Sequence, residues 1–192
     1  METVTLYTVQ DPSIMKDIET KDIIIPKEPN IEHLDDKKAY NWIFQKMKEI
    51  GLCLNNETNH MFWAFTDKEN CKHFEGILFE LEVPVNCVFF TDYIDYHSIL
   101  NNGPVCILPG NPEDWTEEDL NKEYDRLVKE RLIEKSWDNC IIKYTGNGMF
   151  RSHTFGNILA VNEKCTIQAN LECIKKEWIK KHYVNQTREI VF

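Results

Sequence analysis

Three polar side chains alternate along one predicted strand near the end of the chain. Gln168, Asn170 and Glu172 occupy every second position within Thr166–Ile174, and apolar residues stand between them. Because successive side chains of a strand point to opposite faces, this spacing places three hydrogen-bonding groups on one face. Such a face either lines a binding groove or lies at the solvent-exposed surface of a sheet. The sequence leaves both interpretations open.

Two other polar clusters are shorter. Asp92, Asp95 and His97 lie at i, i+3 and i+5, so the two carboxylates can share a helix face while the imidazole points away. As metal ligands they lack a fourth group, and His97 equally fits a histidine at a helix end. Gly146-Asn147-Gly148, followed by Arg151, either cradles a phosphate through backbone N–H groups or forms a hairpin turn. The chain contains no P-loop, G-x-G-x-x-G, H-E-x-x-H or G-x-S-x-G motif.

The seven cysteines are spread along the chain without a C-x-x-C pair. A structural zinc site needs four ligands, commonly in two close pairs, and Cys71-Lys72-His73 is the one close pair of cysteine and histidine. The pattern therefore predicts reduced, mostly buried thiols and no metal site.

The composition is that of a folded, acidic protein. The 192 residues are 42% hydrophobic and 11% aromatic, which is ample for a buried core. No apolar run approaches the roughly 20 residues that a membrane-spanning helix needs, and the first residues do not resemble a secretion signal, so we expect a cytoplasmic protein. With 22 basic and 32 acidic residues the net charge is −10, which disfavours nucleic acid and suits a basic protein partner, although solubility alone can also produce it. The basic residues gather only in Lys175–His182, which fits a solvated face beside Trp178.

Hydrophobic periodicity predicts an α+β fold. Apolar residues that alternate with polar ones indicate strands, whereas apolar residues three and four positions apart indicate helices. The expected strands lie at Thr3–Val9, Ile23–Ile25, Met61–Phe65, Ile77–Val83, Cys87–Phe90, Ile158–Val161 and Thr166–Ile174, with a loop or hairpin at Thr145–His153. The expected helices start at Pro12 after a cap at Asp11, span Tyr40–Ile50, follow Thr91 or Asp92, and follow a cap at Thr116, with a helical turn around Trp178. We expect a single domain over 1–192, with a mainly antiparallel or mixed sheet and about three to four helices.

Blocks of sequence spread nearly end to end resemble the bacterial and phage family known as domain of unknown function 3841. They are LYTVQ at Leu6–Gln10, AYNWIFQKM at Ala39–Met47, FWAF at Phe62–Phe65, ILFELEVP at Ile77–Pro84, TDYIDYHSILN at Thr91–Asn101, IEKSWDNCI at Ile133–Ile141 and IQANLECIKKEWIKK at Ile167–Lys181. The order and spacing of these blocks are specific. The chain departs from the family pattern at Phe65 and Tyr96, where the family usually has tryptophan, and at Glu172, where it has an aromatic residue. The resemblance implies a fold but no reaction, and the departures argue against an aromatic cage.

A second resemblance concerns both ends of the chain. LYTVQ, followed by a helix and Ile23-Ile24-Ile25, is similar to the first block of ADP-ribosyltransferase-like domains, which fold around NAD. Gln168-Ala169-Asn170 is similar to their closing Gln-Ala-Glu strand, in which the Glu stabilises an oxocarbenium-like transition state by its charge. Since Asn170 is uncharged, the resemblance assigns catalysis to Glu172 with Gln168, or else it implies a degenerate enzyme. It assigns NAD binding to Tyr7, Thr8, Gln10, Trp63 and Asn170, although those enzymes usually carry Arg or His near the position of Thr8.

Two functions remain open from the sequence. The first is an NAD-binding, ADP-ribosyltransferase-like domain, catalytically degenerate if Glu172 does not supply the missing charge. It requires the strands at Leu6–Gln10 and Ile167–Glu172 to turn their polar side chains toward a shared hollow. The alternative is a non-catalytic acidic binding protein, such as a phage or mobile-element inhibitor of a host factor, whose binding should weaken with salt. Neither function involves nucleic acid or a membrane.

Overall fold

The computed structural model describes residues 1–27, 34–52, 60–108, 110, 112–145, 148–152, 158–160 and 165–185. Gly146, Asn147, His153 and Val161, which enter the predictions above, lie outside these ranges. The chain forms two compact units. The first unit comprises Met1–Asn30, Asn41–Phe89 and Thr166–Phe192, and the second comprises Ile31–Tyr40 and Phe90–Cys165. The single domain expected over 1–192 stays a prediction.

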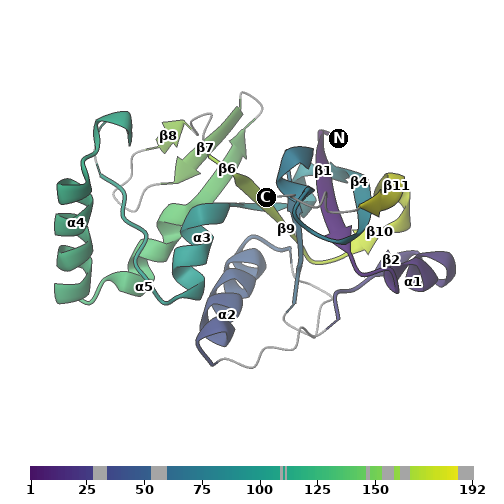
Figure 1. The fold of residues 1–192 in the computed structure, drawn as a ribbon, viewed down its shortest axis with the longest axis horizontal. Helices are drawn as coiled ribbons and strands as arrows, with labels where there is room; N and C mark the ends of the chain where they lie inside the picture. Colours follow the sequence, from purple (N-terminus) through teal and green to yellow (C-terminus); the bar gives the residue numbers. More distant parts are fainter. Residues whose placement is uncertain are drawn as a thin grey trace, which may run out of the picture. The chain divides into compact units, whose positions relative to one another are not determined.

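Antiparallel strands form the sheet of the first unit, in the order β11-β4-β1-β3-β9 (Figure 1). Their bounds are β1 Thr3–Gln10, β3 Phe62–Phe65, β4 Gly76–Pro84, β9 Ile167–Leu171 and β11 Ile179–Asn185. A separate antiparallel pair joins β2 Ile23–Ile24 to β10 Ile174–Lys175. The strand predicted over Thr166–Ile174 is therefore divided between two sheets.

The pairing of β1 with β4 explains the alternation in β4. Leu6 lies opposite Leu81, and both side chains are fully buried. Glu80 and Glu82 project from the other face and are half-buried. Because opposite residues of paired strands share a face, the apolar positions of both strands build one core layer. This agrees with the prediction that β4 has one polar face.

The helices of the first unit start and end at identifiable residues. Helix α1 (Ile14–Thr20) begins two residues later than predicted, because the Asp11 carboxylate accepts from the Ser13 N–H at 2.8 Å and closes a turn before it. Helix α2 (Leu34–Glu49) contributes its residues from 41 onward to this unit. It ends at Glu49 and is followed by Gly51, whose φ of +81° lies in the left-handed region as predicted for a helix stop. Short 3₁₀ turns lie at η1 Lys68–Cys71, η2 Val85–Cys87 and η5 Lys176–Trp178.

The second unit is also α+β and antiparallel. Its strands run in the order β5-β6-β7-β8. They are β5 Phe89–Asp92, of which 90–92 belong to this unit, β6 Ile141–Thr145, β7 Gly148–Ser152 and β8 Ile158–Ala160. The helices are α3 Tyr93–Leu100, α4 Glu117–Lys129 and α5 Ile133–Ser136, with 3₁₀ turns at η3 Pro112–Asp114 and η4 Trp137–Cys140. The α+β fold with a mostly antiparallel sheet is confirmed, and α5 is an additional short helix.

Side chains from α5 and η4 anchor the segment that follows α3. The Trp137 indole N–H donates to the Gly103 carbonyl at 2.9 Å. The Ser136 hydroxyl accepts from the Val105 N–H at 3.0 Å, and the Asn139 amide donates to the Val105 carbonyl at 2.9 Å. These side chains satisfy backbone groups of an irregular buried segment, which strand or helix pairing cannot satisfy.

Within the part of the chain that the structure describes, no helix has the length and apolarity to cross a bilayer.

Candidate functional site

The strands nearest the two termini lie in the same sheet, on either side of β3. Tyr7 of β1 is opposite Phe65 of β3, and Phe65 is opposite Gln168 of β9. Trp63 is opposite Asn170 in the same register. Because paired residues project to one face, Tyr7, Trp63, Gln168 and Asn170 share a face of the sheet. The structure therefore places on one face three of the five residues assigned to NAD binding, together with Gln168, which was assigned to catalysis.

Thr8 and Gln10 lie on the opposite face of β1. The Gln10 amide donates to the Thr8 hydroxyl at 2.7 Å, and this hydroxyl donates to the Trp63 carbonyl at 2.5 Å. Thr8 is almost completely buried. These polar groups therefore connect β1 to β3 inside the unit, away from the face that carries Tyr7.

The amides of β9 are buried and bonded to each other. Gln168 and Asn170 have no exposed surface. Gln168 Nε2 donates to Asn170 Oδ1 at 2.9 Å, and Asn170 Nδ2 donates to the Phe89 carbonyl at 3.0 Å. Among the described residues, Gln168 Oε1 has no hydrogen-bond partner. The polar face of this strand is thus neither a solvent-exposed surface nor the lining of an open groove.

Glu172 lies beyond the paired part of the strand. Strand β9 ends at Leu171, and β10 starts at Ile174 in the other sheet. The Glu172 side chain is half-buried. In the resemblance, the transferase glutamate corresponds to Asn170, which is neutral and buried. The nearest carboxylate, that of Glu172, follows the last residue of β9 that pairs with β3.

A buried charge cluster lies in the second unit. Asp92 caps α3, since its Oδ1 accepts from the N–H groups of Ile94 at 2.9 Å and Asp95 at 3.1 Å. Arg151 of β7 donates through Nη2 to Asp92 Oδ2, and its Nη1 forms an ion pair with Asp95 Oδ2 at 2.8 Å. The Cys165 thiol donates to Asp92 Oδ2 at 2.7 Å. The Arg151 guanidinium thus contacts two carboxylates. As their spacing predicts, Asp92 and Asp95 lie on the same side of the start of α3.

Burial controls the protonation of this cluster. It raises the pKa of Asp95 to about 6, against the lowering effect of the Arg151 guanidinium and with a smaller raising effect of Asp92. Burial and the Asp92 hydrogen bond raise the pKa of the Cys165 thiol to about 12. A thiol with so high a pKa is a poor nucleophile, and an arginine held by two carboxylates is poorly suited to binding phosphate. We therefore interpret the cluster as structural.

His97 takes no part in the cluster. Its Nδ1 lies 2.8 Å from the Tyr93 carbonyl, and the ring meets the Tyr93 ring edge-on with centroids 4.2 Å apart. In the described ranges, no group of three or more histidine, cysteine or acidic residues is placed to hold a metal ion.

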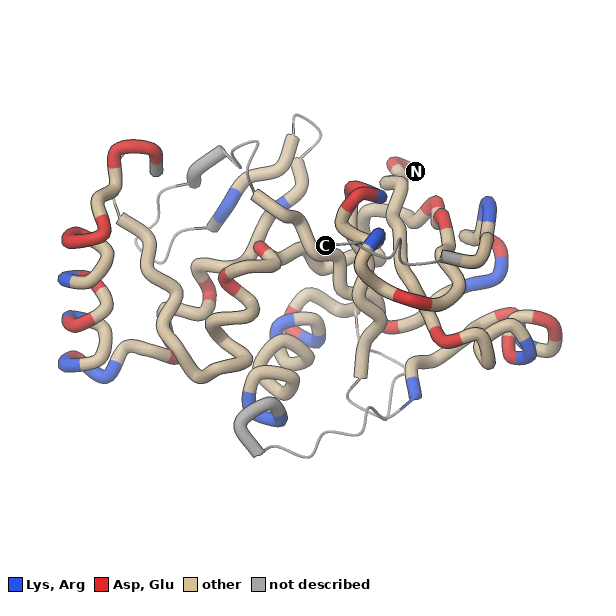
Figure 2. Tube along the Cα trace, viewed as in Figure 1, with Lys and Arg blue, Asp and Glu red and all other residues tan. Residues whose placement is uncertain are grey.

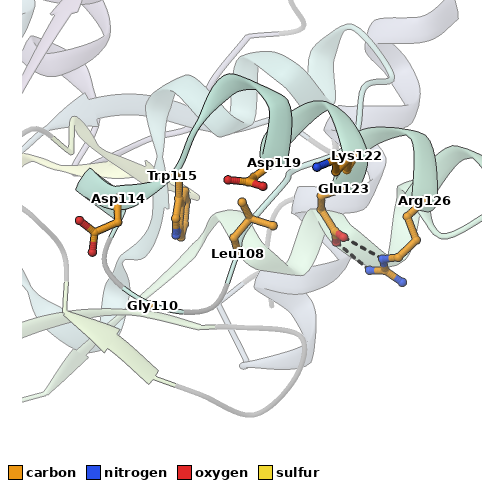
Figure 3. A pocket seen from close by; sticks show the side chains of 8 residues that line it. All are labelled: Leu108, Gly110, Asp114, Trp115, Asp119, Lys122, Glu123 and Arg126. Atoms are coloured by element: carbon orange, nitrogen blue, oxygen red, sulfur yellow. Dashed lines mark hydrogen bonds and ion pairs between the residues drawn. The ribbon is translucent and has the colours of Figure 1, made fainter.

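A hollow of about 610 Å³ lies beside the start of α4, in the second unit. The side chains that surround it come from the segment before the helix and from one helix face (Figure 3). The lining residues are Leu108, Gly110, Asp114, Trp115, Asp119, Lys122, Glu123 and Arg126. The sequence predicts the helix and its cap but not this hollow, because the lining also needs Leu108 and Gly110, whose place beside α4 no local pattern indicates.

The cap of α4 fixes one wall of the hollow. The Thr116 hydroxyl accepts from the Asp119 N–H at 3.2 Å and donates to Asp119 Oδ2 at 2.6 Å. This hydrogen bond lowers the pKa of Asp119, so the group is ionised at neutral pH. Figure 3 shows the Asp119 carboxylate extending toward the Trp115 ring. An aromatic ring with a nearby carboxylate is an arrangement that attracts cations.

Comparisons with known proteins place the chain in a family. No curated protein and no solved structure matches the sequence. The sequence model of the family described as Domain of unknown function (DUF3841) matches residues 5–180, and the chain therefore belongs to this family.

Proposed function

We propose that this protein is a non-catalytic binding protein whose partner presents a basic segment. The observation that carries the proposal is the uneven distribution of charge. Between 113 and 130 there are eight acidic and three basic residues, a balance of −5, which is half of the net charge of −10. Figure 2 shows acidic residues recurring along α4 and the turn before it.

A requirement for solubility does not explain this concentration. Solubility is served by charges of both signs spread over the surface, whereas a local excess of one sign steers and orients a partner of opposite charge. Most of the acidic side chains in this stretch are exposed. We therefore assign the partner to the class of proteins that carry clustered lysine or arginine.

The environment of Asn170 favours binding over transferase chemistry. Stabilising an oxocarbenium-like transition state needs a negative charge at the reacting centre. Asn170 is neutral and fully buried, and it uses its amide to bind Gln168 and the Phe89 carbonyl. On this basis we propose that the protein does not transfer ADP-ribose.

Affinity capture with charge variants tests the proposal. Glu117→Gln, Glu118→Gln and Asp125→Asn together reduce the charge of α4, and the matched control changes the exposed Glu19, Asp22 and Glu177 of the first unit to amides. We expect wild type and control to capture the same Lys/Arg-rich protein and the α4 variant to lose it. Raising salt from about 0.1 M to about 1 M, which shortens the Debye length from about 10 Å to about 3 Å, should release it. Equal capture by both variants, or capture that is insensitive to salt, would contradict the proposal.

NAD binding is the second candidate function. It is favoured by Tyr7 and Trp63, two half-buried aromatic residues on one face of the sheet, whereas the Asn170 amide on that face is fully buried and already hydrogen-bonded. A ligand at 100 times its dissociation constant should stabilise the protein by about 2.7 kcal/mol and raise its melting temperature. No shift at millimolar NAD would exclude this function, and release of nicotinamide above a buffer blank would contradict the non-catalytic assignment.

A further inference from the structure

We propose that the hollow beside α4 binds an arginine side chain of the basic partner, stacked on Trp115 and paired with Asp114 and Asp119. The inference rests on the proposed function, because it assigns a site to the same partner. It is carried by two properties of the hollow: two carboxylates that form no ion pair, and an aromatic wall.

The basic side chains around the hollow already have partners. Arg126 pairs with Glu123 at 2.7 Å and with Glu130 at 2.9 Å. Lys122 pairs with Glu118 at 2.8 Å. These pairs neutralise the cations of the lining and the Glu123 carboxylate.

Two carboxylates of the lining form no ion pair. Among the described residues, neither Asp114 nor Asp119 pairs with a cation, and Asp119 accepts a hydrogen bond from the Thr116 hydroxyl. Both acids line the hollow, with the Trp115 ring between them along the chain (Figure 3). The lining carries three carboxylates and two cations, a net charge of −1, and the two carboxylates without an ion pair lie beside an aromatic ring.

Trp115 provides the second recognition element. Its ring is half-buried, and its Nε1 is buried and has no acceptor in the described part of the chain. Because Nε1 has almost no accessible surface, an occupant of the hollow meets the ring and not this N–H, and an aromatic ring attracts a cation.

Arginine fits the hollow better than lysine. A guanidinium stacks flat on an indole ring and donates in its own plane to carboxylates, whereas an ammonium is a compact, strongly hydrated charge. The volume of about 610 Å³ lies within the range of small-ligand sites, so the hollow has room for the side chain and adjoining backbone. The class of occupant is thus an arginine-bearing segment.

The test follows the indole N–H resonance of Trp115 by NMR, using the full chain labelled with ¹⁵N. The chain has five tryptophans, and Trp115→Phe identifies the resonance by its disappearance. The probe is the peptide acetyl-Gly-Arg-Gly-amide, and the matched probe replaces arginine by citrulline, which has nearly the same shape but no charge. We expect the arginine peptide to shift the resonance in a saturable manner and the citrulline peptide to leave it unchanged.

Two single variants distinguish a contact in the hollow from the general attraction of a cation to an acidic protein. Asp114→Asn should weaken arginine binding about fivefold, as expected for losing an exposed ion pair. Asp22→Asn is the same substitution at an exposed residue of the first unit that does not line the hollow, and it should leave binding unchanged. Asp119 is not substituted because it belongs to the helix cap.

Failure of this inference can be distinguished from failure of the proposed function. The hollow is excluded if the resonance does not move at about 10 mM arginine peptide, if citrulline moves it equally, or if Asp22→Asn weakens binding as much as Asp114→Asn. If capture of the basic partner still depends on the acids of α4 in that case, the proposed function stands and only its site is wrong. If capture is also insensitive to those acids, both are wrong.

Discussion

Arg151 Nη1 forms an ion pair with Asp95 Oδ2 at 2.8 Å, and this contact ties the hairpin of β6 and β7 to helix α3. The guanidinium is largely buried, with 18% of the side chain exposed, and it also holds the Asp92 carboxylate that caps the same helix. One cation thus compensates two carboxylates in a place where water cannot do so. Removing a single member of such a cluster leaves charge uncompensated.

We expect Arg151→Met to destabilise the protein strongly. The substitution keeps an apolar stem but leaves Asp92 and Asp95 facing each other without a cation, which typically costs about 3–5 kcal/mol of unfolding free energy. Urea denaturation followed by circular dichroism measures the loss. Arg126→Met is the matched control, because Arg126 also holds two carboxylates but lies at the surface, where ion pairs contribute little. If both substitutions lower the urea midpoint equally, the expected difference between a buried ion-pair cluster and a more exposed one is contradicted.

The stability contribution of Asp95 should decrease as the pH rises. Burial raises its folded pKa from 3.8 to about 6, so the folded state holds the proton more tightly than the unfolded state. Its contribution is therefore complete below about pH 4 and is lost as the pH rises through about 6, a change of about 3 kcal/mol. Urea midpoints measured from pH 4 to 7 on wild type and Asp95→Asn should differ in slope over this window. Parallel curves would contradict the raised pKa.

Most of the thiols should react slowly in the folded protein. Burial raises the pKa of Cys71 and Cys165 to about 12 and that of Cys106 and Cys173 to about 11, and it raises the pKa of Cys140 as well. At pH 7 about one such thiol in 10⁴ or fewer is a thiolate, the reactive form. Iodoacetamide labelling read by mass spectrometry should therefore accelerate on the order of a hundredfold in urea. Fast labelling of any of these five cysteines in native buffer would show that its thiol is accessible and activated.

Local chemistry made parts of this fold predictable. Residue type and the pattern that follows predict a cap at Thr91 or Asp92 and another at Thr116. The side chains of Asp92 and Thr116 accept backbone N–H groups at the starts of α3 and α4. The stop at Gly51 and the polar face of β4 follow from equally local rules. Such features depend on residues a few positions apart, which a single sequence displays directly.

Long-range contacts explain what the sequence did not reveal. Strand β11 was not expected, because its lysines suggested a solvated face and its pairing partner β4 lies about a hundred residues earlier. The period-two pattern of β9 correctly placed Gln168 and Asn170 on one face, but such a pattern cannot distinguish a solvated face from a buried one. The deciding contact is the hydrogen bond from Asn170 to the Phe89 carbonyl, 81 positions away.

The amides of β9 allow a direct comparison between a structural role and a binding role. Asn170→Leu removes the partner of both Gln168 Nε2 and the Phe89 carbonyl, whereas Gln168→Leu removes only the donor to Asn170 Oδ1. Each buried group left unpaired costs about 1–3 kcal/mol, so we expect Asn170→Leu to lose about twice as much unfolding free energy as Gln168→Leu. The change at Gln168 also removes an oxygen that has no partner among the described residues, which further reduces its cost. Urea denaturation measures both losses. If Asn170→Leu instead leaves stability unchanged and abolishes a thermal shift caused by NAD, this amide serves the ligand, and the non-catalytic assignment loses the support it draws from Asn170.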